Sequence, residues 1–203
     1  MSYEPDGPQN RMFGRSPSMK GRSKFEDSPI VNFVFEHMLH LLDSPARRWF
    51  NDPVKTLRAA GVRPGLEVLE VGCGTGFFTI PAAEMVGDDG CVHAFDIHPL
   101  AVEQTAAKMS DARLRNVRLT KTDALETGLP DESYDLILLF GVIPAPVLPL
   151  NKLLPEMHRL LRPGGSMAVW TGLPLWSPRQ VTKGGLFTHV GKRNWVHNFT
   201  RNG

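Results

Sequence analysis

The sequence has 203 residues, of which 41% are hydrophobic and 22% are charged, as in a folded domain of ordinary composition. The longest apolar run, residues 136–150, contains three prolines and is shorter than the about 20 residues that a membrane-spanning helix needs. Two cysteines are too few for a disulfide scaffold, and the first residues lack the pattern of a secretory signal. We therefore expect a cytoplasmic protein without a membrane span.

The net charge of +2 is distributed unevenly along the chain. Residues 1–24 contain five basic and two acidic residues, and residues 178–203 contain five basic residues and no acidic one. The part between them is acidic. A basic segment of this kind attracts phosphate groups, but it is also common on a solvated surface, and the sequence favours the second interpretation.

The N-terminal quarter of the chain predicts a flexible arm followed by helices. Residues 1–24 are rich in Pro, Gly, Ser and Arg and show no periodicity, which is typical of a flexible arm. Ser28 and Pro29 resemble the start of a helix, and apolar residues recur behind them at three- and four-residue spacing. A second helix is expected to open at Pro45 or Pro53 and to end at Gly61. Residues 25–64 would form a helical lid, and residues 65–203 the core of the same single domain.

From residue 66 onward, short apolar runs alternate with helical stretches. This alternation predicts an α/β fold with a mainly parallel sheet, and the last two runs predict a closing antiparallel hairpin. The expected strands are Leu66–Val71, Cys91–Phe95, Val117–Thr120, Tyr134–Phe140, Ser166–Trp170, Leu186–Val190 and Trp195–Thr200. Helices are expected up to Val86, from Pro99 to Met109, up to about Leu161, and briefly after Pro178.

The most informative segment is a glycine-rich loop directly behind the first expected strand. Gly72, Gly74 and Gly76 follow this strand and precede a helix, a place where glycine permits unusual backbone angles and close approach of a ligand. Phe77 occupies the position where the dinucleotide fingerprint G-x-G-x-x-G has its third glycine. The loop therefore predicts a nucleotide-like ligand but argues against NAD and FAD.

Two aspartates follow the next two expected strands. Asp96 lies 20 residues after Gly76, where a carboxylate can accept hydrogen bonds from both hydroxyls of an adenosine ribose. Asp123 could accept a hydrogen bond from the exocyclic amine of adenine while the amide of Ala124 donates to a ring nitrogen. Since the carboxyl ends of parallel strands form one edge of a sheet, these residues and the glycine loop predict one ligand site.

Four segments together resemble the class I S-adenosylmethionine-dependent methyltransferases, and in order and spacing the subgroup with the ubiquinone- and menaquinone-biosynthesis enzymes. They are residues 70–76, residues 94–99, residues 122–124 with 129–135, and residues 160–165. The resemblance covers about residues 45–200 and implies a Rossmann-like, doubly wound, seven-stranded sheet that binds S-adenosylmethionine.

The resemblance also implies a role for each residue of the site. The methionine moiety would be held by Glu70 and by the backbone of Gly72, Cys73, Gly74, Thr75 and Gly76. Asp96 would bind the ribose, Ile97 would pack on adenine, Asp123 and Ala124 would bind the edge of adenine, and Phe140 and Gly141 would line the sulfonium pocket.

Structural interpretations of the same acidic residues remain open. Glu70 could cap the following helix, because the helix dipole favours a carboxylate at the N-terminus. Asp96 could cap the helix at Pro99, and Asp123 could form a turn. Asp135 is expected to be a structural residue at the start of its strand. The histidines show no spacing typical of a metal site, so no metal is predicted.

Methyl transfer from a sulfonium is a direct displacement, so no catalytic residue can be assigned from a motif. An oxygen or carbon acceptor would need a base, for which His37, His40, His189 and His197 are candidates. The apolar segment after Phe140 favours a small apolar or aromatic acceptor.

Two alternatives remain: a non-catalytic S-adenosylmethionine-binding protein, or an RNA methyltransferase that uses the basic C-terminal segment. The RNA surface would consist of Arg179, Lys183, Phe187, Lys192, Arg193 and Trp195.

Overall fold

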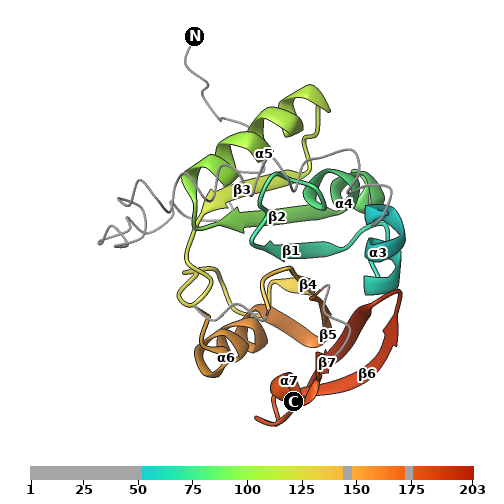
Figure 1. Cartoon of the computed structure of the whole chain (residues 1–203). Helices are drawn as coiled ribbons and strands as arrows, with labels where there is room; N and C mark the ends of the chain where they lie inside the picture. Colours follow the sequence, from blue (N-terminus) through green and yellow to red (C-terminus); the bar gives the residue numbers. More distant parts are fainter. Residues whose placement is uncertain (1–51, 144–147, 172–175) are drawn as a thin grey trace.

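The computed structural model describes residues 52–143, 148–171 and 176–203, and within them seven strands form one sheet (Figure 1). The order of the strands across the sheet is β3-β2-β1-β4-β5-β7-β6. Their bounds are β1 (Glu67–Val71), β2 (Cys91–Asp96), β3 (Val117–Lys121), β4 (Tyr134–Phe140), β5 (Leu161–Trp170), β6 (Phe187–Arg193) and β7 (Val196–Arg201).

Strands β1 to β5 pair in parallel, whereas β7 pairs antiparallel with both β5 and β6. The predicted α/β class, with a mostly parallel sheet and an antiparallel hairpin at its end, is therefore confirmed. The order of the strands reverses between β1 and β4. In open α/β sheets, ligands bind at the carboxyl ends of the strands at such a reversal.

The described residues contain five helices, of which the first precedes β1 and the other four connect strands: α3 (Pro53–Ala60), α4 (Thr79–Val86), α5 (Pro99–Asp111), α6 (Leu150–Leu160) and α7 (Arg179–Thr182). Two of them begin as their sequences predict. The Asp52 side chain accepts hydrogen bonds from the first turn of α3, and the His98 side chain caps α5, with proline in the first turn of each helix. Pro53, and not Pro45, opens the helix that ends at Gly61.

The sheet separates two hydrophobic cores. Neighbouring residues of β4 alternate between them, because successive side chains of a strand point to opposite faces: Ile137 and Leu139 belong to one core and Leu136 and Leu138 to the other. Buried side chains of α6 and α7 complete the first core, and those of α3 and α4 complete the second. Both faces of the central strands are thus covered, as the continuous apolar run of β4 predicts.

Two local expectations need correction. Strand β6 runs three residues further than predicted, to Arg193, so the turn of the final hairpin is tighter, and Trp195 lies in this turn rather than in β7. Strand β5 begins at Leu161, five residues before the expected Ser166, and its pairing with β4 shifts between Tyr134 and Leu136.

The expected flexible arm, residues 1–24, and most of the expected lid, residues 25–64, lie outside the described residues. The division of the chain into an arm and one domain therefore stays a prediction. In the parts of the chain that the structure describes, no helix has the length and apolar character needed to cross a membrane.

Candidate cofactor site

The glycine loop is fixed to the neighbouring strand by its own backbone. The N–H groups of Gly72 and Cys73 both donate to the carbonyl oxygen of Phe95, the residue before the last one of β2. The carbonyl oxygen of Gly74 accepts a hydrogen bond of 3.0 Å from the hydroxyl of Thr105 on α5. The loop thus has contacts on both sides, which gives its backbone a defined shape before any ligand binds.

The three glycines of the loop meet different surroundings. A Cβ atom at Gly72 would lie 2.9 Å from Val142, and one at Gly76 would lie 3.2 Å from Thr105, so these two positions have no room for a side chain. A Cβ atom at Gly74 would meet none of the described residues within 4 Å, and the backbone there has a φ of +55°. The surface at Gly74 is therefore open, which fits the close approach of a ligand to the main chain.

Asp96 connects the glycine loop with the start of α5. One carboxylate oxygen accepts from the N–H of Gly74 at 3.0 Å, and the other accepts from the N–H of His98 at 2.9 Å. Burial raises the pKa of Asp96, although these backbone hydrogen bonds act in the opposite direction. Each oxygen of an ionised carboxylate can accept a second hydrogen bond, so Asp96 keeps capacity for two hydroxyl groups. The cap of α5 is His98, so Asp96 is not the residue that caps this helix.

Glu70 is almost completely buried at the end of β1 and faces α4. Its carboxylate accepts a hydrogen bond of 2.6 Å from the hydroxyl of Thr79, the first residue of that helix. The charges of Glu70 and Asp96 also act on Cys73, where burial, with a contribution from both carboxylates, raises the pKa of the thiol. The loop is therefore surrounded by negative charge, and Cys73 remains a neutral thiol.

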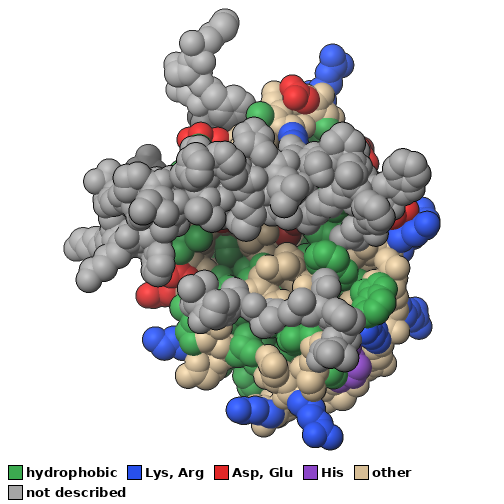
Figure 2. All heavy atoms as spheres, in the orientation of Figure 1, with side chains coloured by type: hydrophobic (Ala, Val, Ile, Leu, Met, Phe, Trp, Pro, Cys, Tyr) green, Lys and Arg blue, Asp and Glu red, His purple; other side chains and the backbone are tan. Residues whose placement is uncertain are grey.

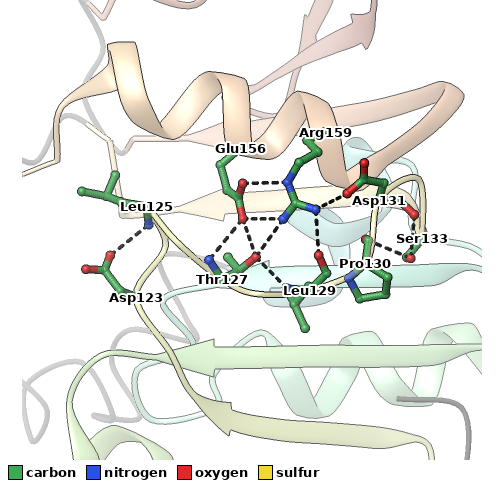
Figure 3. A network of polar contacts seen from close by, with 9 residues as sticks. All are labelled: Asp123, Leu125, Thr127, Leu129, Pro130, Asp131, Ser133, Glu156 and Arg159. Atoms are coloured by element: carbon green, nitrogen blue, oxygen red, sulfur yellow. Dashed lines mark hydrogen bonds and ion pairs between the residues drawn. The ribbon is translucent and has the colours of Figure 1, made fainter. Parts of the chain in front are cut away.

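The loop behind β3 carries Asp123 and is tied to α6. One oxygen of Asp123 accepts from the N–H of Leu125 at 2.9 Å, so this residue does form a turn. Figure 3 shows how Glu156 and Arg159 of α6 hold the following residues. Glu156 accepts from both the N–H and the hydroxyl of Thr127, and Arg159 donates to the carbonyl oxygen of Leu129 at 2.8 Å.

Burial by itself would raise the pKa of Glu156. Hydrogen bonds from Arg159 and Thr127 have the larger combined effect and lower this pKa. Arg159 also donates to Asp131. Sequence reasoning missed this network, because the residues that it joins lie about 30 positions apart and belong to no motif. Thr105, which supports Gly74, was missed for the same reason.

The remaining predicted residues line the same edge of the sheet. Ile97 follows Asp96 and is 45% exposed, an unusual state for a large apolar side chain. Ala124 is buried beside Asp123, and Phe140 ends β4 with its ring 4.8 Å from that of Phe78. Gly141 donates to the carbonyl oxygen of Trp170, the last residue of β5, so the ends of β4 and β5 meet here.

Two of the four candidate bases are described. His197 and His189 contact each other, with 3.2 Å between Nδ1 and Nε2, and His197 also packs on Trp176. Burial, assisted by Lys192 and His189, lowers the pKa of His197. His37 and His40 lie outside the described residues.

The contacts also test the roles that the sequence predicts for Asp135 and Phe187. Asp135 is a structural residue, as predicted: it accepts from the N–H of Glu67 at 2.9 Å and pairs with Arg162 at 2.7 Å. The expectation that Phe187 belongs to an RNA-stacking surface is wrong, because Phe187 is only 1% exposed and forms part of a hydrophobic core.

Comparison with known proteins agrees with this geometry. Residues 68–165 match the family model described as a methyltransferase domain. The demethylmenaquinone methyltransferase of Listeria monocytogenes is 33% identical over 139 residues, which are 68% of this chain and 54% of that protein. The aklanonic acid methyltransferase DauC of a Streptomyces species is 43% identical over 74 residues, or 36% of this chain and 34% of that protein. The chain thus spans about half the length of the Listeria relative that it matches.

A solved structure of an S-adenosylmethionine-dependent methyltransferase from Aquifex aeolicus has a TM-score of 0.68 and 26% sequence identity. The alignment covers 81% of this chain and 96% of that one. The family model, the demethylmenaquinone relatives and the shared sheet confirm the predicted resemblance and the predicted cofactor. Residues 68–165 thus match a methyltransferase domain, and the chain resembles the class I S-adenosylmethionine-dependent methyltransferases, in particular the menaquinone-biosynthesis enzymes.

Proposed function

We propose that this protein transfers the methyl group of S-adenosylmethionine to a small apolar or aromatic acceptor. The observation that carries the proposal is the open backbone at Gly74, which lies directly beside the carboxylate of Asp96 at the reversal of the strand order. The names of the relatives, which give demethylmenaquinone and aklanonic acid as acceptors, support a small molecule as substrate.

The residues of the site fit the methyl donor in shape and charge. A ligand can approach Gly74, where a Cβ atom would have no neighbour within 4 Å among the residues that the structure describes, and Asp96 has lone pairs left for two ribose hydroxyls. Asp123 and the N–H of Ala124 would bind adenine, on which Ile97 would pack, and the buried Glu70 would favour the cationic methionine end. Acidic groups around the loop suit a ligand that carries a sulfonium and an ammonium group.

The neighbouring part of the edge is apolar and would receive the acceptor. The rings of Phe78 and Phe140 lie 4.8 Å apart, and those of Phe78 and Trp170 lie 6.1 Å apart, both in edge-to-face arrangements. Ile143, just behind Gly141, is buried. Of these side chains only Trp170 is partly exposed, so it would contact the acceptor and remove apolar surface from water, while the buried Phe78 and Phe140 would support it from behind.

In the proposed reaction the acceptor forms a bond to the methyl carbon while the carbon–sulfur bond breaks, and the electron pair of that bond stays on sulfur. The donor supplies an activated methyl group with a neutral leaving thioether, so the protein has no leaving group to protonate. What this chain contributes is alignment: the rigid glycine loop and Asp96 fix one reactant, and the aromatic edge fixes the other and excludes water. A proton lost by the acceptor passes to a base or to solvent.

The test is incubation of the full chain with methyl-labelled donor and a cell extract divided into small molecules, RNA and protein. We expect label in the apolar small-molecule fraction, and none when Gly74→Val replaces the wild type. Label only in RNA would establish the alternative acceptor. Binding of the donor without transfer to any fraction would establish the non-catalytic alternative.

A further inference from the structure

Three large hydrophobic side chains of the described residues are markedly exposed: Ile97, Val190 and Trp195. Ile97 belongs to the proposed adenine site. Val190 is 61% exposed and Trp195 is 55% exposed, and both lie in the β6–β7 hairpin at the edge of the sheet. Single exposed apolar residues are common, but the occurrence of two of the three in one hairpin needs an explanation.

The turn of this hairpin holds Trp195 exposed in an unfavourable backbone conformation. Asn194 and Trp195 both have positive φ, 44° and 64°, a conformation that asparagine tolerates but that a bulky side chain such as tryptophan disfavours. The Asn194 amide lies 3.4 Å from the hydroxyl of Thr56 on α3, which adds a contact between the turn and the body of the domain. The tryptophan is therefore displayed by a strained turn that the fold maintains.

A basic side chain lies over the exposed tryptophan, and a second basic residue precedes the turn. The ammonium group of Lys192 lies 4.3 Å from the centre of the Trp195 ring, and Arg193 is the last residue of β6 before the turn. Within the described parts of the chain, neither Lys192 nor Arg193 has an ion pair with an acidic residue, whereas Arg201 at the far end of β7 pairs with Glu132. Figure 2 shows hydrophobic and basic side chains side by side at the right of the view, over the tip of the hairpin.

The tip of the hairpin borders the edge that would receive the acceptor. Trp170, at the carboxyl end of β5, is paired with Val196 directly behind the turn. The carbonyl oxygen of Trp170 also accepts the hydrogen bond from Gly141 at the end of β4, at 2.8 Å. We call the surface of Val190, Lys192, Arg193 and Trp195 the hairpin surface; β5 and β7 lie between its strand, β6, and the proposed sulfonium pocket at the end of β4.

We propose that the hairpin surface docks on an anionic lipid bilayer. Tryptophan places its ring at the boundary between water and hydrocarbon, and lysine and arginine are attracted by anionic headgroups. The part of this inference that concerns substrate rests on the proposed function: an apolar acceptor dissolves in a bilayer, and docking at this edge would bring the site to it. RNA fits less well, because Val190 cannot stack on a base and Phe187 is buried.

The test measures cosedimentation of the full chain, without methyl donor, with vesicles of phosphatidylcholine alone or mixed with phosphatidylglycerol. We expect binding to the anionic vesicles that weakens as salt is raised. Trp195→Asn keeps a residue that tolerates positive φ and should weaken binding severalfold. The double variant Lys192→Gln/Arg193→Gln should weaken it by about fivefold for each charge removed.

The matched control is the double variant Arg113→Gln/Arg115→Gln, which removes two exposed charges before β3, at the opposite edge of the sheet. It should bind vesicles like the wild type. Equal binding to both kinds of vesicle, an equal loss in the control, or tighter binding to single-stranded RNA that needs Trp195 would each overturn the proposal. Since no methyl transfer is measured, failure of the proposed function would leave this result unchanged.

Discussion

Replacement of Asp96 by asparagine tests the link between the strand edge and the methyl donor. The Asp96 carboxylate accepts one hydrogen bond from Gly74 and one from His98, and would accept two more from the ribose of the donor. An asparagine side chain would keep the size of the group but would have one accepting oxygen and no charge. The variant therefore loses acceptor capacity for both the loop and the ligand.

The expected loss follows from these contacts. Hydrogen bonds to a charged group contribute about 1.5–3 kcal/mol each, so loss of one ribose contact and weakening of the other costs about 3 kcal/mol. This corresponds to about a 100-fold increase in the dissociation constant, at about 1.4 kcal/mol for each factor of ten. Because the Gly74 or His98 N–H also loses its acceptor, we expect a small fall in melting temperature.

The assay is titration calorimetry with S-adenosylhomocysteine, and the matched control is Asp135→Asn. Asp135 also accepts one backbone N–H, from Glu67, but at the opposite end of the strands. The control should lose stability and keep its affinity for the ligand. Unchanged affinity in Asp96→Asn, or equal loss in both variants, would refute the ribose assignment.

Three further predictions concern the loop, the buried histidine and the α6 network. Gly74→Val meets no described residue within 4 Å but strains the backbone at a φ of +55°, so it should lower the melting temperature and should abolish S-adenosylhomocysteine binding in calorimetry of the folded variant; retained binding would contradict the open cradle. Burial, together with Arg118, lowers the pKa of His93 from 6.5 to about 4, so the unfolded chain takes up a proton first as the pH falls. The free energy of unfolding should therefore decrease by about 3 kcal/mol from pH 7 to 4 on account of His93, which denaturant titrations of wild type and His93→Gln would detect as a smaller decrease in the variant. Glu156→Gln should lower the affinity for S-adenosylhomocysteine about two- to fivefold, since it loosens the loop behind Asp123, whereas an unchanged affinity with a lower melting temperature would show that the network is only structural.

Much of the fold could be predicted because periodicity and glycine positions act locally. The apolar run of β4 and the alternation of strands and helices indicated a covered parallel sheet, and this is what the pairing shows. The hairpin was predicted less accurately. Asn194 and Trp195 both adopt positive φ, and neither is a glycine, the residue that would have indicated such a turn in the sequence.

The candidate site likewise contains residues that the sequence indicated and residues that it did not. Gly74 and Asp96 carry a local signal, since one follows a strand within a glycine loop and the other ends the next strand, and the structure joins them by a hydrogen bond. Thr105, Glu156 and Arg159 support the site through contacts between residues about 30 positions apart in the sequence. Their chemistry becomes visible only when the helices pack on the sheet, so one sequence without its structure could not indicate them.

The most direct test of the central claim is a crystal structure of the full chain with S-adenosylhomocysteine. The account predicts the amino acid end over the glycine loop, both ribose hydroxyls on Asp96, and adenine between Ile97 and Asp123. The ligand bound at any other surface, or bound here with its ribose away from Asp96, would contradict it.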